Sequence, residues 1–345
     1  MMTLQRRLLL AAAGATLLAA RSGVQAQGLE KPQLTLAVGG KNLLYHLPLT
    51  IAERLGYFKA EGLDIRIVDF AGGSPALRAL LGGSADVVSG AFEHTVNMQA
   101  KGHRLRAIVL MGRAPQIVLG VNPRTLPNFK SVVDLRGKKI GVTSPGGSTN
   151  VMANFVLAKA GVKPGEVRFI GVGTGTGAVA AMRSGQIDAI SNLDPVISLL
   201  VRSKDLLIVS DTRIVAEADK VFGGPMPAGC LYVAQRFVDQ HPRTAQALAT
   251  AIVRANQWIQ QAGAGDILKA VPESYLLGDR AVYIDAFLAA KGALSPDGVF
   301  PEKGAETAFR ALASIDPEIA RVTLDLKAVY TNDFVKVALG KFPIK

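Results

Sequence analysis

The sequence predicts an α/β protein of two lobes, each a small sheet flanked by helices, with a helical C-terminal extension. Three observations lead to this prediction. Short apolar runs alternate with stretches of helical spacing, one segment of the chain occurs twice, and from Phe237 onward the pattern is mostly helical with no counterpart in the repeat. Strands that alternate with helices usually form parallel sheets with helices on both faces.

The internal repeat is the strongest of these observations. The stretch Ala79–Ser89 reappears as Ala181–Ser191, with glycine, aspartate and serine at matching places and apolar residues between them. The repeated unit has the order strand, glycine-rich turn, helix, turn and strand. A duplicated unit of this kind predicts two lobes of similar architecture.

The individual elements follow from local chemistry. Apolar runs predict strands, apolar residues spaced by three and four predict helices, and Gly161 ends one of those helices. Ser74, followed by Pro75, is expected to cap a helix start. The expected strands are 34–38, 65–70 and 139–142, and the expected helices are 49–58, 148–160 and 245–259.

The first 26 residues have the pattern of a signal peptide. Arg6 and Arg7 precede the apolar run Leu8–Ala20, which is too short to span a bilayer as a helix. Val24-Gln25-Ala26 provides small residues where a signal peptidase reads them, so we expect cleavage after Ala26 and a periplasmic protein. The Sec and the twin-arginine routes both remain open, and the alternative is a buried N-terminal helix.

Composition excludes several classes of protein. The single cysteine, Cys230, rules out an internal disulfide and CxxC metal motifs, and it is expected to be a buried apolar residue. Four scattered histidines argue against a metal site, and no cofactor is expected. The formal net charge of +12 falls to +9 when Arg6, Arg7 and Arg21 are removed with the first 26 residues, and a basic exported protein favours an anionic ligand. Scattered bases and only 6% aromatic residues argue against nucleic-acid binding.

Two crossings of the chain define the expected lobes. Lobe 1 comprises 27–115 and 230–345, lobe 2 comprises 116–229, and the crossovers lie near residues 116–122 and 225–233. Ligands of open α/β sheets bind at the carboxyl ends of the strands, so the cleft between the lobes is the expected binding site. We expect the protein to be a monomer.

Glycine-rich turns at three helix starts are expected to face this cleft. Such turns leave backbone amides unpaired, and together with the helix dipole they form anion sites. The alternative is that their hydroxyls only cap their own helices. The candidate ligand-binding residues from these turns are Gly73, Ser74, Ser144, Gly147, Ser148, Thr149 and Thr174.

Residues that follow other strands complete the candidate site. Gly90 follows a strand of lobe 1, and Asn192 and Asp194 hold the matching place in lobe 2, where Asp194 is equally a candidate helix cap. Arg113, beside the first crossover, is the best candidate for a direct charge partner, or else forms a salt bridge across the hinge. Glu93 and His94 are expected to be solvated or to support the site indirectly.

The order of several motifs resembles that of a known family. The motifs are Asn42-x-x-Tyr45-His46-x-Pro48, Gly56-Tyr57-Phe58, Gly83-Ser84-Ala85-Asp86-Val87 and Asp134–Val142. Over residues 33 to 260 they resemble periplasmic substrate-binding proteins of the nitrate/sulfonate/taurine type, which serve ABC importers. The resemblance implies a type II binding-protein fold, closure on a small solute and delivery to a permease in the inner membrane.

The resemblance also implies that the loop holding Asn42, Tyr45 and His46 contacts the ligand. We therefore expect a receptor without catalytic activity, although the identity of the solute stays open. The main alternative is an enzyme of the related pyrimidine (thiamine precursor) synthase fold, whose cysteine-rich iron site is not found in this sequence. A dinucleotide fingerprint at Gly173-x-Gly175-x-x-Ala178 is rejected, because these glycines belong to the repeated scaffold.

Overall fold

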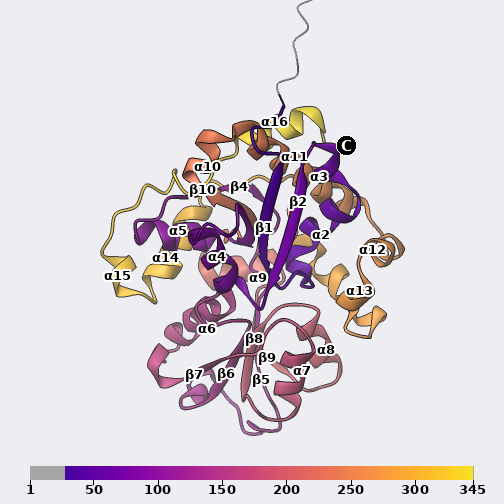
Figure 1. The fold of residues 1–345 in the computed structure, drawn as a ribbon. Coiled ribbons are helices and arrows are strands. Elements are labelled where there is room, and N and C mark those ends of the chain that lie inside the picture. The colour runs from indigo at the N-terminus through magenta and orange to yellow at the C-terminus, as the bar shows by residue number, and fades with distance from the viewer. Residues whose placement is uncertain (1–27, 345) are drawn as a thin grey trace, which may run out of the picture.

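Two five-stranded sheets organise residues 28–344, which are the residues that the computed structural model describes (Figure 1). The first sheet has the order β2-β1-β3-β10-β4 and the second has the order β7-β6-β8-β5-β9. The expected signal peptide lies outside the described residues. The strands of the first sheet are β1 (Gln33–Gly39), β2 (Asp64–Phe70), β3 (Val87–Ala91), β4 (Leu105–Leu110) and β10 (Gly229–Ala234). Those of the second are β5 (Val118–Val121), β6 (Lys139–Val142), β7 (Arg168–Gly171), β8 (Ala189–Asn192) and β9 (Leu207–Asp211).

Both sheets are mixed, which corrects the expectation of parallel sheets. β2, β1 and β3 are parallel to one another, as are β7, β6 and β8. β10 lies antiparallel between β3 and β4, and β5 lies antiparallel between β8 and β9. The chain crosses between the sheets twice, and β5 and β10 are the first strands after these crossings. Each of them therefore enters its sheet from the side on which the other sheet lies.

The sequence repeat corresponds to a structural repeat. β1, β2 and β3 of the first sheet hold the places that β6, β7 and β8 hold in the second, and β10 and β5 occupy equivalent positions. Helix α4 (Gly73–Leu81) precedes β3 just as α7 (Thr176–Arg183) precedes β8. The two matching segments of sequence therefore build the same unit twice.

Helices cover both sheets (Figure 1). The expected helix at 49–58 is interrupted at Gly56, whose φ of 72° lies in the left-handed region that glycine adopts without strain. The remaining early helices are η1 (Leu44–His46), α2 (Leu47–Arg54), α3 (Tyr57–Ala60) and α5 (Glu93–Ala100). Around the second sheet lie η2 (Val132–Leu135), α6 (Ser148–Lys159), η3 (Pro164–Glu166) and α8 (Val196–Arg202). Ala218 of α9 (Val215–Phe222) packs instead with Ala114 and Ala293.

The C-terminal region is helical and packs mainly on the first sheet. α11 buries one apolar face, which includes Leu248, Ile252 and Ile259, against α2 and the last helix. Full burial of each such side chain is worth roughly 1.5–3 kcal/mol. The region comprises α10 (Gln235–Gln240), α11 (Pro242–Gln261), α12 (Ala264–Ala270), η4 (Glu273–Leu276), α13 (Arg280–Ala290), η5 (Lys291–Ala293), α14 (Gly304–Ala313), α15 (Pro317–Ala320) and α16 (Asp333–Lys341).

One part of this region also reaches the second sheet. α13 packs against α8, and Leu277 joins the apolar cluster that α7 and α8 form. Arg202 of α8 lies 4.0 Å from Asp279 and 3.9 Å from Asp285. The helical extension therefore touches both halves of the molecule and does not cover the first sheet alone.

Candidate functional site

A small cavity lies between the two sheets. Its volume is about 30 Å³, and because one water molecule needs roughly 10–15 Å³ of such space, it is of the scale of a very small solute. The first sheet and its loops contribute Gly39, Leu43, Tyr45, His46, Gly73, Ser89, Gly90 and Ala91. The other half of the chain contributes Ile117, Thr143, Ser148, Thr149 and Leu193.

Two helices begin at this cavity, one from each half. α4 begins at Gly73 and α6 begins at Ser148, and both residues line the cavity. Gly72 and Gly147 precede them and provide no side-chain cap. The amides of a helix's first turn have no partner within the helix, and the helix dipole gives this end a partial positive charge. The cavity therefore combines two helix ends that favour an anion.

The two helix starts lie close together. Ser74 Oγ donates a hydrogen bond to the backbone carbonyl of Pro145 at 3.0 Å, so this hydroxyl joins the two halves and does not cap α4 as expected. A Cβ atom on Gly72 would lie 2.5 Å from Ser144 Oγ. Ser144 Oγ is buried and, within residues 28–344, has no hydrogen-bond partner. A polar atom without a partner therefore lies between the two helix starts.

A second set of contacts joins the halves beside the cavity. Asn42 Nδ2 donates to the backbone carbonyl of Thr174 at 2.8 Å, and Thr174 Oγ1 donates to Asn42 Oδ1 at 3.0 Å. The amide of Leu44 donates to the backbone carbonyl of Asp194 at 3.1 Å. Asn42 and Thr174 therefore connect the two halves, and neither side chain lines the cavity.

Two rings from the loop after β1 form part of the cavity wall. His46 Nδ1 lies 2.9 Å from Ser89 Oγ. Burial lowers the pKa of His46 to about 3, against the opposing effect of a hydrogen bond to the backbone of Gly39, so the imidazole is neutral at physiological pH. The Tyr45 ring packs edge-on against His46, and its hydroxyl is buried with no partner within the described chain.

Hydrogen bonds between two threonines order the part of the cavity wall that the second sheet and α6 contribute. Thr149 Oγ1 accepts the backbone amide of Thr143 at 3.0 Å and lies 3.0 Å from Thr143 Oγ1. The backbone carbonyl of Thr149 accepts a 2.7 Å hydrogen bond from Ser191 Oγ. These bonds fix the start of α6 relative to β6 and β8, and they leave Ser148 at the cavity.

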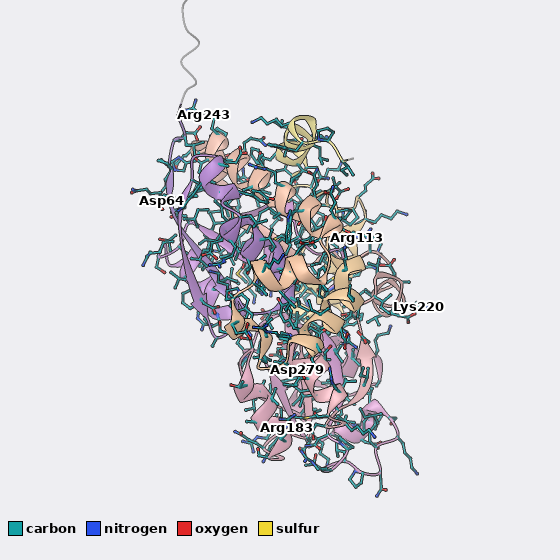
Figure 2. All side chains as sticks on the ribbon, turned by 90° about the vertical axis from the view of Figure 1, so that its right-hand side faces the viewer. Asp64, Arg113, Arg183, Lys220, Arg243 and Asp279 are labelled. Atoms are coloured by element: carbon teal, nitrogen blue, oxygen red, sulfur yellow. The ribbon has the colours of Figure 1, made fainter. Side chains whose placement is uncertain are left out.

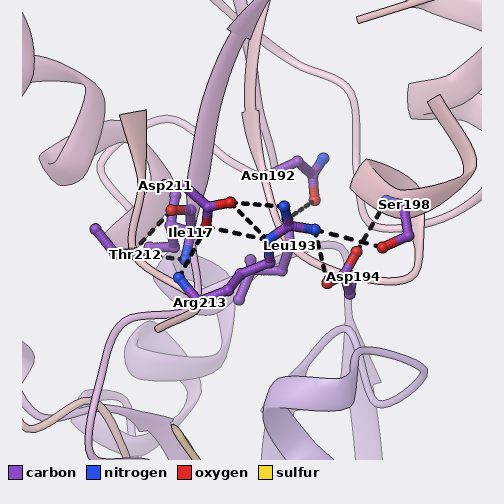
Figure 3. A network of polar contacts seen from close by, with 8 residues as sticks. All are labelled: Ile117, Asn192, Leu193, Asp194, Ser198, Asp211, Thr212 and Arg213. Carbon is purple, nitrogen blue, oxygen red and sulfur yellow. Dashed lines mark hydrogen bonds and ion pairs between the residues drawn. The ribbon is translucent and has the colours of Figure 1, made fainter. Parts of the chain in front are cut away.

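A partly buried ion-pair network lies next to Leu193 (Figure 3). Asp194 Oδ1 accepts the amide of Ser198 at 2.8 Å, which satisfies a first-turn donor of α8 as the capping alternative expected. Arg213 lies 3.4 Å from Asp194 and 2.6 Å from Asp211. Asn192 Nδ2 donates to the carbonyl of Gly173 at 3.1 Å. Asn192 and Asp194 therefore have partners within the second half and do not line the cavity.

Arg113 does not lie at the cavity. Its side chain is exposed on the flank of the molecule, and its guanidinium donates a 2.6 Å hydrogen bond to the carbonyl of Gly292 (Figure 2). Its backbone amide also donates to the carbonyl of Ala293. Arg113 therefore fastens the C-terminal region to the first chain crossing.

The positions of Glu93 and His94 rule out the solvated alternative and leave the expectation of indirect support for the site. Both are buried, with 5% and 3% of their surface exposed, whereas solvated positions were one expectation for them. His94 Nδ1 lies 3.0 Å from Tyr232 Oη. Cys230 is fully buried, as expected.

Of the candidate residues, six line the cavity: Tyr45, His46, Gly73, Gly90, Ser148 and Thr149. The sequence analysis missed Gly39, Leu43, Ser89, Ala91, Ile117, Thr143 and Leu193. Ser89 and Thr143 could have been predicted from the sequence, since both lie at the carboxyl end of a predicted strand. No lysine or arginine lines the cavity, so the groups that form its wall are neutral side chains and backbone.

Other hollows among residues 28–344 lie away from the gap between the sheets. Larger hollows of about 380 and 690 Å³ lie on outer surfaces, the first around 102–105 and 234–239 and the second around 257–261 and 341–344. No three metal-binding side chains come together in the described part of the chain. Within it, none of the helices has the length and apolar character needed to cross a bilayer.

Comparison with known proteins gives a family and a fold. The model of the NMT1-like family matches residues 27–271. YtlA of Bacillus subtilis, which is named as a binding protein, is 23% identical over 67% of this chain and 68% of its own. A Brucella abortus protein, also named as a binding protein, is 33% identical over 44% of each chain, so the match spans less than half of that relative. A pyrimidine phosphate synthase of Schizosaccharomyces pombe is 24% identical over 42% of this chain and 40% of its own.

Solved structures show the same architecture. A protein from Bordetella bronchiseptica RB50 is 59% identical, with a TM-score of 0.90 over 92% of this chain and all of its own. The nitrate-binding protein NrtA of Synechocystis has a TM-score of 0.73 at 16% identity over 92% and 91% of the chains. The alkanesulfonate-binding protein SsuA of Xanthomonas axonopodis has a TM-score of 0.68 at 18% identity over 88% and 100%. The fold is that of the periplasmic binding proteins.

Proposed function

The chain belongs to the NMT1-like family, and from that premise we propose that it is an extracytoplasmic receptor that captures a small anionic solute between two lobes. The observation that carries the proposal is the cavity between the sheets, at which α4 and α6 begin from opposite sides. A ligand held by both helix starts favours the closed arrangement, because only that arrangement gives it both sets of contacts.

The proposed lobes are residues 27–115 with 230–345, and residues 116–229. The two chain crossings between β4 and β5 and between β9 and β10 would act as the hinge. We further propose that residues 1–26 direct export to the periplasm and that the closed receptor delivers its solute to an ABC-type permease. The likeness to NrtA and SsuA supports this proposal through the shared fold.

An anionic solute is proposed although no basic side chain lines the cavity. The buried hydroxyls of Tyr45 and Ser144 lack partners within the described chain, and each can donate to an acceptor-rich ligand. Each helix end contributes about 0.3–1 kcal/mol to binding an anion at an exposed site, and more where water is excluded. Main-chain amides and neutral hydroxyls would therefore replace the usual arginine or lysine.

Thermal unfolding in the presence of small anions tests the proposal. Nitrate, bicarbonate, acetate, methanesulfonate and sulfate are compared at matched ionic strength with sodium chloride. A bound anion should raise the melting temperature progressively with its concentration, since it stabilises only the folded protein. Stabilisation by cations or uncharged sugars alone would contradict an anion receptor.

The likeness to pyrimidine phosphate synthases keeps an enzyme as the second candidate. The two functions differ in what happens to a bound molecule. A receptor releases its ligand unchanged on unfolding, whereas an enzyme converts its substrate during incubation. Mass spectrometry of the small molecules released before and after prolonged incubation distinguishes them.

A further inference from the structure

Glu93 is a buried carboxylate beside the cavity. It is the first residue of α5, which follows β3 after the single residue Phe92, and Ser89, Gly90 and Ala91 of β3 line the cavity. Only 5% of its surface is exposed. Among the hydrogen bonds and ion pairs of residues 28–344, none involves the Glu93 carboxylate.

Two other buried polar groups near the cavity also lack partners in the described chain. The Tyr45 hydroxyl has no partner, and His94 Nε2 has none either. A Cβ atom on Gly73 would lie 3.2 Å from the ring of His94, so that ring lies directly behind the cavity wall. Burial is the main cause of a raised pKa at the Tyr45 hydroxyl and at the Cys230 thiol, and the negative charge of Glu93 raises both values further. Cys230 lies opposite Gly90 in the sheet. The charge of Glu93 therefore acts on Tyr45, which lines the cavity, and on Cys230 in the neighbouring strand.

An ionised carboxylate removed from water is costly unless it is paired. The position of Glu93 at the start of α5 offsets part of this cost through the helix dipole. No basic side chain among residues 28–344 forms an ion pair with it. A solute bound in the cavity could provide the hydrogen-bond partner that the Glu93 carboxylate lacks.

We propose that Glu93 accepts a hydrogen bond from an ammonium or other N–H donor of the solute. This inference rests on the proposed receptor function and narrows the solute class. The solute would carry an anionic group facing the starts of α4 and α6 and a donor facing Glu93 and Tyr45. Glu93 would also select against simple anions, because it repels a negative charge that brings no donor.

Matched pairs of probes test this inference by calorimetric titration. Glycine is compared with acetate, and aminomethanesulfonate with methanesulfonate. The amine-bearing member of at least one pair should bind about 10- to 100-fold more tightly, as expected for a hydrogen bond to a buried charged group. In Glu93→Gln this difference should shrink to about threefold or less. Glu306→Gln changes an exposed carboxylate, also in the first turn of a helix, and should keep the full difference.

The melting temperature of the protein without added solute gives a second readout. Glu93→Gln removes a buried charge without a partner, so it should leave the melting temperature unchanged or raise it. A clear fall would show that the protein itself satisfies the carboxylate, and this would overturn the inference.

The binding outcomes separate the inference from the proposed function. If simple anions bind as tightly as their amine-bearing partners and Glu93→Gln changes neither, the inference is wrong and the anion receptor stands. If neither member of either pair binds, while nitrate, bicarbonate and sulfate also fail to stabilise the protein, both the inference and the proposed function are wrong.

Discussion

Asn42 and Thr174 form two hydrogen bonds with each other across the gap between the two sheets. The Asn42 amide donates to the Thr174 carbonyl, and the Thr174 hydroxyl donates to the Asn42 side-chain oxygen. A Cβ atom on Gly40 would lie 2.5 Å from the Thr174 methyl group, so the two halves approach closely only because residue 40 is glycine. In the proposed receptor, opening of the lobes would break these bonds, so they would favour the closed arrangement without touching the solute.

Thr174→Val should therefore weaken solute binding although the residue does not line the cavity. Loss of a side-chain hydrogen bond costs about 1 kcal/mol, so we expect an affinity decrease of roughly fivefold by calorimetric titration with the best-binding anion. Thr125→Val is the matched control, because the buried Thr125 hydroxyl has no partner within the described chain. Equal affinities for the two variants would exclude a role for the Asn42–Thr174 contact in closure.

Gly72→Ala should obstruct closure directly. The added Cβ would lie 2.5 Å from Ser144 Oγ, 2.8 Å from Ser144 Cβ and 3.2 Å from its backbone nitrogen, so rotation of the hydroxyl cannot relieve the overlap. Overpacking of this kind costs about 1–3 kcal/mol, or roughly 5- to 150-fold in affinity. Gly175→Ala, whose Cβ would contact nothing within 4 Å, should bind normally. Normal binding by Gly72→Ala would mean that the solute is held without this approach.

His46 should make the folded protein sensitive to acid. The folded protein holds its pKa near 3, whereas the unfolded imidazole titrates near its ordinary value of 6.5, so between these values the unfolded chain binds more protons. The free energy of unfolding should fall by about 1.4 kcal/mol for each unit of decreasing pH within this window. Denaturant titrations of His46→Asn, compared at about pH 7 and pH 5, should lack this contribution. Identical pH dependence of the two proteins would show that His46 becomes protonated without unfolding.

Arg213 should contribute strongly to stability. Its removal in Arg213→Met leaves the carboxylates of Asp194 and Asp211 without their counter-ion, and the Asp194 side chain is only 3% exposed. Breaking a buried pair typically costs about 3–5 kcal/mol. The comparison is Lys220→Ala, which breaks an exposed pair with Glu217 and should cost less than about 1 kcal/mol. Chemical denaturation measures both, and similar small losses would contradict a structural role for Arg213.

Much of the fold could be predicted because the repeat and the strand–helix alternation are local properties of the chain. The segment Ala181–Ser191 repeats Ala79–Ser89, and the structure gives both the same place in equivalent sheets. The antiparallel direction of β5 and β10 could not be predicted, since apolar periodicity marks a strand but not its neighbours. Their pairing depends on which sheet the chain enters after each crossing.

The candidate site was predicted best where it depends on backbone geometry. Tyr45 lies after a strand, and Gly73 and Ser148 begin helices, so a rule about element ends was enough to place them. Charge was a poorer guide. Arg113 is bound by the carbonyl of Gly292, a distant part of the chain, whereas Arg213, which no motif marked, forms the buried ion pairs. The partner of a long basic side chain depends on the tertiary structure.

Closure of the two lobes on a small anion can be measured as a distance between Arg66 and Arg168, exposed positions on the edge strands β2 and β7. Spin labels attached to Arg66→Cys and Arg168→Cys would report it by pulsed electron resonance, because the buried Cys230 does not react. With the best-binding anion at saturation, the distance distribution should shift to shorter values and become narrower. A distribution that stays the same while calorimetry shows the anion bound would contradict the account.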